Sequence, residues 1–101
     1  MTLEGGGNKM AIKLVTYDLN KQGQDYKDLY REIKSIGPCI NPLDSVWLIK
    51  TELTCLEIKK KLRSVMDTND HIIVVPYAND KNGERSSNLK KEFVNWIQAN
   101  I

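Results

Sequence analysis

The alternation of apolar and polar side chains predicts a strand and then an amphipathic helix in the first third of the chain. Residues 12–17 read as a strand, because apolar and β-branched side chains are frequent there. After a polar stretch at residues 18–24, Asp25 is predicted to begin a helix that ends at Gly37-Pro38. Apolar side chains recur at helical spacing on one face of this helix: Tyr26, Leu29, Tyr30, Ile33 and Ile36.

The middle of the chain predicts two strands and a second helix. A short strand is expected at residues 39–41, followed by a turn at residues 42–44 that Pro42 introduces, and then a longer strand over residues 45–51. Thr54 and Glu57 have the spacing of a capping box, which predicts that a helix begins there. The apolar stripe of that helix is Ile58, Leu62, Val65 and Met66.

The last part of the chain predicts one more strand and one more helix. Residues 71–77 form an apolar run, and Pro76 indicates that this strand lies at a sheet edge or ends there. A polar loop over residues 79–88 leads into a helix predicted over residues 88–100. The apolar face of this helix is Leu89, Phe93, Trp96 and Ile97.

This order of elements predicts an α+β fold. With right-handed crossovers, a β-α-β-β-α-β order forms a ferredoxin-like four-stranded antiparallel sheet with two helices on one face, here with an additional C-terminal helix. We expect a single domain over residues 10–101. Residues 1–9 contain a Gly5-Gly6-Gly7 run, and we interpret them as a flexible segment or a remnant of cloning.

Both faces of the predicted sheet are apolar. In the strand at residues 71–77, Ile72 and Val74 point to one face, while Ile73, Val75 and Tyr77 point to the other. A sheet with one solvated face should alternate apolar and polar residues, so the second face needs a cover. Either the last helix or another copy of the protein could supply it. We expect a two-fold homodimer with the last helix as partial cover.

The composition is that of an ordinary folded protein and does not indicate a particular function. The 101 residues are 41% hydrophobic and 28% charged, which is typical of a folded protein, and the formal net charge of +2 is too small to indicate nucleic-acid binding by itself. No apolar run is long enough to span a membrane. We interpret Cys39 and Cys55 as reduced thiols in a cytoplasmic protein, although the sequence alone leaves a disulfide open.

Three stretches resemble a known family. They are LVTYDLN at residues 14–20, LDSVWLIKT at 43–51 and NDHIIVV at 69–75, together with Gly23-Gln24-Asp25-Tyr26. They are similar to the family built like the second CRISPR-associated (Cas) protein, which includes the VapD toxins, and in particular to its SinR-like branch. The resemblance extends from Met10 to about Tyr77.

The resemblance implies a ferredoxin-like homodimer. It also implies that Asp18, at the end of the first strand, is a ligand for a divalent metal at the dimer interface. Family activities include metal-dependent cleavage of RNA or DNA, and some members only bind DNA beside an integrase. The Cas proteins usually carry basic residues just after this aspartate, whereas this chain has residues 20–24, Asn-Lys-Gln-Gly-Gln, which puts phosphate contact at this loop in doubt.

Asp18 is the strongest candidate for chemistry. It precedes Asp25 by seven residues, too early to cap the following helix, and strand alternation places it on the same face as Leu14 and Thr16. One carboxylate is a poor site for Mg²⁺, which takes six oxygen ligands, several usually from water. Two copies of Asp18 across a dimer axis would supply two carboxylates. The alternative is an aspartate that bonds backbone N–H groups of a turn.

Three further polar residues are weaker candidates. Asn20 could orient a metal-bound water, but shaping the turn is the better interpretation. Ser45 could bond a phosphate oxygen near Asp18, and its position also suits the start of a strand. His71 is the single histidine, and an ordinary residue at the start of a strand is favoured over an acid–base role.

Basic residues give a candidate nucleic-acid surface. Lys59, Lys60 and Arg63 belong to the densest basic run, and we expect Lys50 nearby. These side chains could neutralise phosphates, although such a run is also typical of the solvated face of a helix. Trp47 and Trp96 could stack on bases, but both fall in apolar stripes and are expected in the core or an interface.

The sequence is consistent with two main classes of function. The first is a nucleic-acid-acting homodimer, a Mg²⁺-dependent endonuclease or endoribonuclease with Asp18 paired at the interface. The second is a catalytically inert dimer that binds nucleic acid or a protein partner in regulation, defence or phage biology. A toxin or phage factor directed at a host protein is a third possibility.

Overall fold

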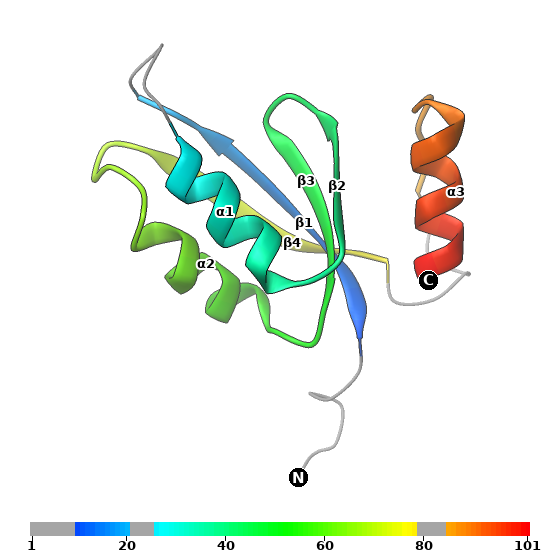
Figure 1. Cartoon of the computed structure of the whole chain (residues 1–101), viewed down its shortest axis with the longest axis horizontal. Coiled ribbons are helices and arrows are strands. Elements are labelled where there is room, and N and C mark those ends of the chain that lie inside the picture. Colours follow the sequence, from blue (N-terminus) through cyan, green and yellow to red (C-terminus); the bar gives the residue numbers. More distant parts are fainter. Residues whose placement is uncertain (1–9, 21–25, 79–84) are drawn as a thin grey trace, which may run out of the picture.

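The fold was described from a computed structural model, in which residues 10–20, 26–78 and 85–101 are described. The described elements, in chain order, are β1 (Ala11–Asp18), α1 (Lys27–Ile36), β2 (Cys39–Leu43), β3 (Val46–Thr51), α2 (Cys55–Arg63), β4 (His71–Ala78) and α3 (Lys91–Asn100) (Figure 1). The strands form one antiparallel sheet in the order β2-β3-β1-β4. The predicted ferredoxin-like α+β fold with an extra C-terminal helix is therefore confirmed.

Strand β1 runs through the middle of the sheet and fixes which side chains share a face. Leu14 pairs with Leu48 on β3 and with Val75 on β4, while Val15 pairs with Trp47 and Val74. Directly paired residues project to the same side of an antiparallel sheet, so these two sets point to opposite faces. Strand β4 has only β1 as a neighbour, and its edge position is the one predicted from Pro76.

The main core lies between the sheet and helices α1 and α2, which cover the same face (Figure 1). Its buried residues are Val15, Tyr17, Tyr26, Leu29, Ile33, Trp47, Ile49, Ile58 and Leu62. The indole Nε1 of Trp47 donates a hydrogen bond to the Tyr17 hydroxyl at 3.0 Å, so this polar pair is satisfied inside the core. Burial raises the pKa of Tyr17, and the hydrogen bond from Trp47 offsets part of that rise.

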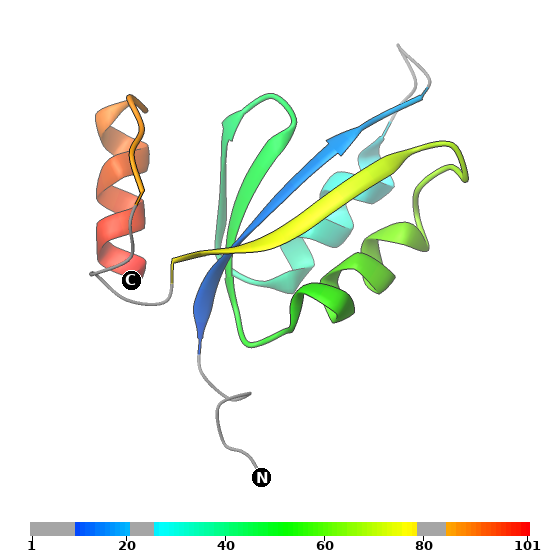
Figure 2. The same cartoon turned by 180° about the vertical axis from the view of Figure 1, so that it is seen from behind.

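The opposite face of the sheet is covered only in part. Helix α3 packs there through Ile97, against Ile12, Leu48 and Ala78. In the view of Figure 2, α3 lies to one side next to β2, and no described helix crosses the part of β1 and β4 that leads to Asp18. Two β4 side chains on this face stay exposed, Ile73 at 59% and Val75 at 41%. The predicted partial cover by the last helix is confirmed.

Several element ends differ from the prediction. Helix α1 begins after Tyr26, which makes no side-chain capping hydrogen bond, and the predicted start at Asp25 lies outside the described residues. Pro42 lies inside β2, because an edge strand can accommodate a missing N–H group. The amide of Asn41 donates to the carbonyls of Leu43 and Val46 at 2.7 and 2.8 Å, which moves the turn to residues 44–45.

The helix ends also differ in detail. The predicted capping box is confirmed, since the Thr54 hydroxyl accepts from the Glu57 N–H and the Glu57 carboxylate accepts from the Thr54 N–H. Helix α2 ends at Arg63, so Val65 and Met66 contact the core from the turns that follow. The last helix starts at Lys91 rather than at residue 88. The predicted N-terminal segment 1–9 and most of the polar loop, residues 79–84, lie outside the described residues.

Gly37, which follows α1, is required by a close approach of two backbone segments. A Cβ atom at this position would collide with the backbone carbonyl of Lys50 on β3. The same junction carries a hydrogen bond of 2.8 Å from the Lys50 N–H to the Pro38 carbonyl. Glycine therefore lets the chain leave α1 and enter the sheet edge directly.

Both cysteines, Cys39 and Cys55, are free thiols, as predicted. Burial raises the pKa of Cys39, and the nearby Lys34 ammonium offsets part of this effect. Among the described residues, no helix combines the length and the apolar character that crossing a bilayer requires.

Candidate functional site

Asp18 is the last residue of β1 and is exposed at the end of the sheet. Its partner across the β1–β4 ladder is His71, the first residue of β4. Directly opposed side chains in an antiparallel pair have Cβ atoms about 5 Å apart and point to the same face. The structure thus places the only histidine of the chain beside the leading candidate carboxylate, an arrangement that the sequence analysis did not predict.

A shallow depression of about 260 Å³ surrounds this pair. Its lining residues are Thr16, Tyr17, Asp18, His71, Ile72 and Ile73. Asp18 and His71 lie at the strand ends, and Ile73, which pairs with Thr16, continues the depression onto the uncovered apolar face. In the part of the chain that the structure describes, the Asp18 carboxylate has no hydrogen bond or ion pair, so it is free to bind a ligand.

A buried carboxylate holds the backbone on both sides of this depression. Asp70 is only 3% exposed, and its Oδ1 accepts from the Asn20 N–H at 2.6 Å while its Oδ2 accepts from the Asp67 N–H at 2.9 Å. Asp70 therefore ties the segment that leaves β1 to the turn that precedes β4. The arrangement fixes the backbone two residues after Asp18 and one residue before His71. A charge-assisted bond of this kind stabilises more than a neutral one.

Asp70 was missed in the sequence analysis. The run Asp67-Thr68-Asn69-Asp70 reads as an ordinary polar turn, and nothing local distinguishes its buried aspartate from the exposed neighbours Thr68 and Asn69. Asn20, a predicted supporting residue, is anchored through its backbone N–H while the residue itself is exposed. Its position agrees with the interpretation that it shapes the turn.

Arg63 contributes to the same turn rather than projecting into solvent. Its Nη1 donates to the backbone carbonyls of Asp67 and Asp70 at 2.9 and 3.1 Å, and its side chain is half-buried. A guanidinium engaged in this way would have to leave the turn to bind a phosphate. The geometry therefore gives the predicted phosphate contact of Arg63 no support.

The other predicted residues lie in three different places. Lys59 and Lys60 are exposed on α2. Ser45 is half-buried in the turn before Val46, which pairs with Thr16, so Ser45 is at the Asp18 end of the sheet. Lys50 pairs with Ile12 at the far end of β1, about 20 Å from Asp18 at the usual rise of a strand. Lys50 lines a depression with Lys61, not with Lys59.

The described residues of one chain do not supply a cluster of three metal ligands. No group of three or more His, Cys, Asp or Glu side chains within residues 10–20, 26–78 and 85–101 is arranged to hold a metal ion. Asp18 offers one carboxylate, and Mg²⁺ prefers oxygen ligands while retaining several waters. Among the described residues, a second Asp18 from another copy would supply the additional carboxylate that such an ion needs.

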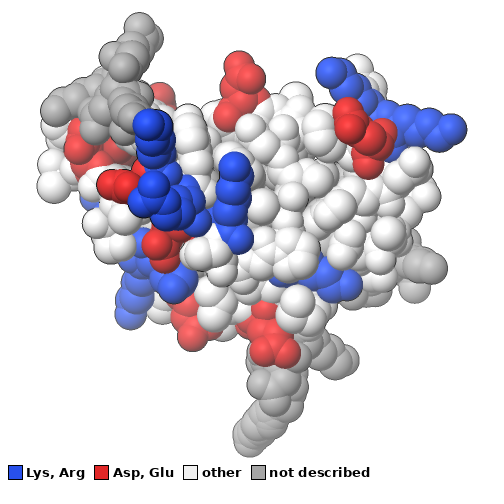
Figure 3. All heavy atoms as spheres, viewed as in Figure 1, with Lys and Arg blue, Asp and Glu red and all other residues white. Residues whose placement is uncertain are grey.

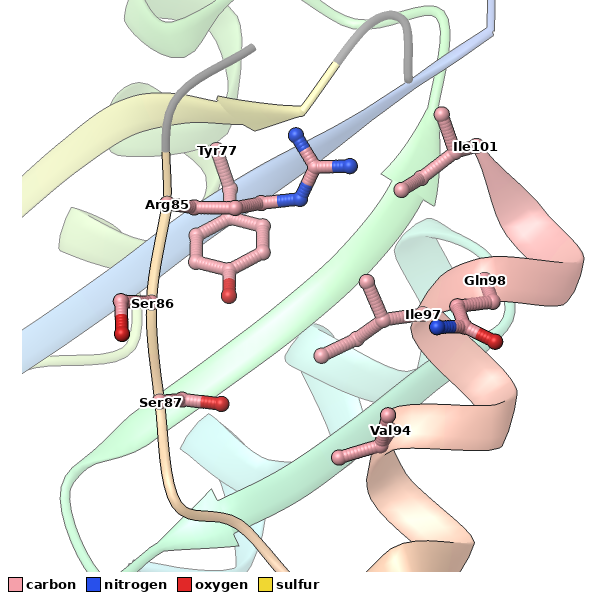
Figure 4. A pocket seen from close by; sticks show the side chains of 8 residues that line it. All are labelled: Tyr77, Arg85, Ser86, Ser87, Val94, Ile97, Gln98 and Ile101. Carbon is pink, nitrogen blue, oxygen red and sulfur yellow. The ribbon is translucent and has the colours of Figure 1, made fainter. Parts of the chain in front are cut away.

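A second depression lies at the opposite end of β4 and does not belong to this site. Figure 4 shows it between α3, the segment that precedes α3 and Tyr77 on β4. Arg85, Ser86 and Ser87 supply its polar side, while Ile97 supplies part of its apolar side. His71 and Tyr77 are separated along β4 by about 20 Å. This depression therefore contributes nothing to the chemistry of Asp18.

No family model matches the chain, and no solved structure matches it. The resemblance to the family of the second Cas protein and VapD therefore stays a prediction, and the site must be argued from its own geometry.

The buried carboxylate of Asp70 gives the first testable prediction. In Asp70→Asn the single amide oxygen can accept from only one of the two N–H groups, and the NH₂ group faces the other. We expect a loss of about 1–3 kcal/mol in the free energy of unfolding, measured with urea. Backbone amide exchange at Asn20 and Asp67 should accelerate more than exchange in α3.

The control for this prediction is Asn69→Ala, which changes the exposed neighbour and should stay within about 0.5 kcal/mol of wild type. Equal stability of Asp70→Asn and wild type, with unchanged exchange at Asn20, would contradict the proposed role of Asp70.

Proposed function

We propose that the protein acts on nucleic acid as a homodimer in which two Asp18 carboxylates share a divalent cation, Mg²⁺. In this proposal it is an endonuclease that hydrolyses phosphodiesters of RNA or DNA. The observation that supports it best is the position of Asp18, an exposed carboxylate without a partner in the described part of the chain, at the rim of an apolar sheet face.

The exposed apolar face supports the dimer. Ile73 and Val75 are among the most exposed large apolar side chains of the described residues, and both lie on an edge strand beside the Asp18 depression. Burying the exposed parts of these side chains is favourable by about 1 kcal/mol each, roughly half the value for a fully exposed side chain. A two-fold contact uses the same patch on both copies. A patch that includes Ile73 would bring both Asp18 depressions toward the axis.

The chemistry then divides among a few residues. A bound divalent cation polarises the phosphate and lowers the pKa of a bound water. Asp18 from each copy would hold the ion, with Asn20 and Ser45 at the same end of the sheet as supporting polar groups. Lys59 and Lys60 are exposed and would contact phosphates of the substrate. The free thiols support the prediction of a cytoplasmic protein.

A second candidate is a dimer without catalytic activity that binds nucleic acid or a protein partner. It is favoured by the absence of a three-residue metal cluster within the described residues of one chain, together with the exposed lysines of α2. This candidate shares the dimer and the basic surface with the first. The two differ only in whether Asp18 binds a metal ion and supports cleavage.

The dimer is tested with matched apolar substitutions. Ile73→Asp places a charge in the proposed contact, whereas Leu56→Asp places one on α2, where Leu56 is 55% exposed and Ile73 is 59% exposed. We expect sedimentation equilibrium to give a dimer for wild type and for Leu56→Asp. The dissociation constant of the Ile73→Asp dimer should be at least about 100-fold higher, because the interface would bury one unpaired carboxylate from each copy. A monomeric wild type, or equal effects of both substitutions, would contradict the proposed interface.

Cleavage is tested with labelled RNA and DNA in Mg²⁺ and in EDTA. Asp18→Asn should lower the rate at least about 100-fold, because it removes both carboxylates from the shared ion. Asp44→Asn, an equivalent change at an exposed turn residue, should cleave like wild type. Cleavage that persists in Asp18→Asn rules out the metal mechanism. Binding that weakens with salt, without any cleavage, supports the inert dimer.

A further inference from the structure

Positive charge is concentrated on one face of the molecule. Helices α1 and α2 together carry seven Lys and Arg side chains and three Asp and Glu side chains, a net charge of +4. The whole chain has a formal net charge of only +2, so the rest of the protein is net negative. Figure 3 shows blue Lys and Arg side chains, with some red ones between them, on the side of the molecule where α1 and α2 lie, and a further blue group near α3. A polyanion would therefore be attracted to this helical face.

Within this face, α1 presents a depression lined by Lys27, Tyr30, Arg31 and Lys34. These residues have the i, i+3, i+4 and i+7 spacing of one helical face, and all four are exposed. We call this set the α1 basic surface. Three cations on one side of a helix, with an aromatic ring between them, resemble the combination that single-stranded nucleic acids bind.

The two acidic residues of α1 neutralise this surface only in part. Glu32 lies 3.5 Å from the ammonium of Lys61 on α2, so its carboxylate is used between the two helices. Asp28 lies 3.2 Å from Arg31, and both side chains are 76% exposed. An exposed ion pair contributes little to stability. Arg31 can therefore exchange Asp28 for a phosphate at small cost.

Tyr30 provides a fixed aromatic surface. It is 38% exposed, and its ring centroid lies 6.1 Å from that of Trp47 with the planes tilted by 33°. Trp47 is buried and is itself held by its hydrogen bond to Tyr17. The Tyr30 ring thus rests on a rigid support, so little side-chain entropy is lost when a base stacks on its exposed part.

We propose that the α1 basic surface binds single-stranded nucleic acid, with Lys27, Arg31 and Lys34 on phosphates and a base stacked on Tyr30. A duplex hides its base faces, so the exposed ring favours a single strand. The inference rests on the nucleic-acid part of the proposed function and requires no cleavage. It adds a second contact surface to the lysines of α2. Helix α1 begins at the end of the sheet where β1 ends, so a strand along it leads toward that rim (Figure 1).

The electrostatic part is tested by fluorescence anisotropy with a labelled single strand of about twelve nucleotides, the length of a typical single-strand site. The double variant Lys27→Gln with Lys34→Gln should bind at least about 10-fold more weakly. Its slope of log affinity against log salt should fall by about 1.4, which corresponds to two lost phosphate contacts. The control Lys90→Gln with Lys91→Gln removes the same charge from the start of α3 and should change affinity less than about twofold.

The aromatic part is tested at Tyr30 alone. Tyr30→Phe keeps the ring and should bind like wild type, whereas Tyr30→Leu should bind about 5- to 100-fold more weakly, the range expected for one lost base stack. Thermal unfolding of both variants checks that the fold is retained. A duplex of the same length should bind more weakly to wild type and should be insensitive to Tyr30→Leu.

The outcomes separate this inference from the proposed function. Equal binding by the α1 and α3 double variants, equal binding by Tyr30→Phe and Tyr30→Leu, or a preference for duplex would overturn the inference. If Lys59→Gln with Lys60→Gln then weakens binding, nucleic-acid binding stands and only the α1 contact is wrong. If wild type binds neither RNA nor DNA, both the inference and the proposed function fail.

Discussion

The sheet is apolar on both faces, and this constraint organises the rest of the molecule. Val15 and Tyr17 of the central strand β1 belong to the main core, while Leu14 and Thr16 project to the other side. Helices α1 and α2 cover the first face, and the main core lies between them and the sheet. Helix α3 reaches only the half of the second face that contains Ile12 and Ala78. The uncovered half ends at Asp18. In the proposed dimer, a second copy covers this half, and the candidate chemistry then lies beside the contact.

A group of side-chain to backbone hydrogen bonds stabilises the end of the sheet that carries Asp18. The carboxylate of Asp70 binds the backbone N–H groups of Asn20 and Asp67, and Arg63 binds the carbonyls of the same turn. These bonds hold the end of β1 and the start of β4 in one arrangement, which keeps Asp18 opposite His71. In the proposed dimer, where Asp18 would bind a metal ion together with its symmetry mate, a fixed backbone is needed, because small displacements would separate the ligands. The basic helices lie on the other side of the sheet and can bind a polyanion whether or not Asp18 is catalytic.

Much of this architecture could be predicted from the sequence, because strand alternation and helical spacing report burial directly. The fold, the edge position of β4, the capping box of Thr54 and the two apolar faces all follow from such local patterns. Features that depend on register or on distant partners could not be predicted. The pairing of Asp18 with His71 needs the alignment of β1 and β4, and the burial of Asp70 needs the turn that Arg63 stabilises. Pro42 suggested a turn, yet β2 continues to Leu43 through an irregularity in its pairing with β3, where the Asn41 amide donates to the carbonyls of Leu43 and Val46.

The central claim is that a two-fold assembly brings two Asp18 carboxylates to one divalent ion. Crystals of the wild-type protein grown with Mn²⁺, measured for anomalous scattering at the manganese edge, test it most directly. Manganese takes oxygen ligands as magnesium does, and it can be located without ambiguity from its anomalous signal. The account predicts one manganese peak on the two-fold axis, within bonding distance of Asp18 from both copies, with Ile73 buried in the contact. Copies that associate with Asp18 on opposite sides of the dimer, or manganese bound elsewhere, would contradict it.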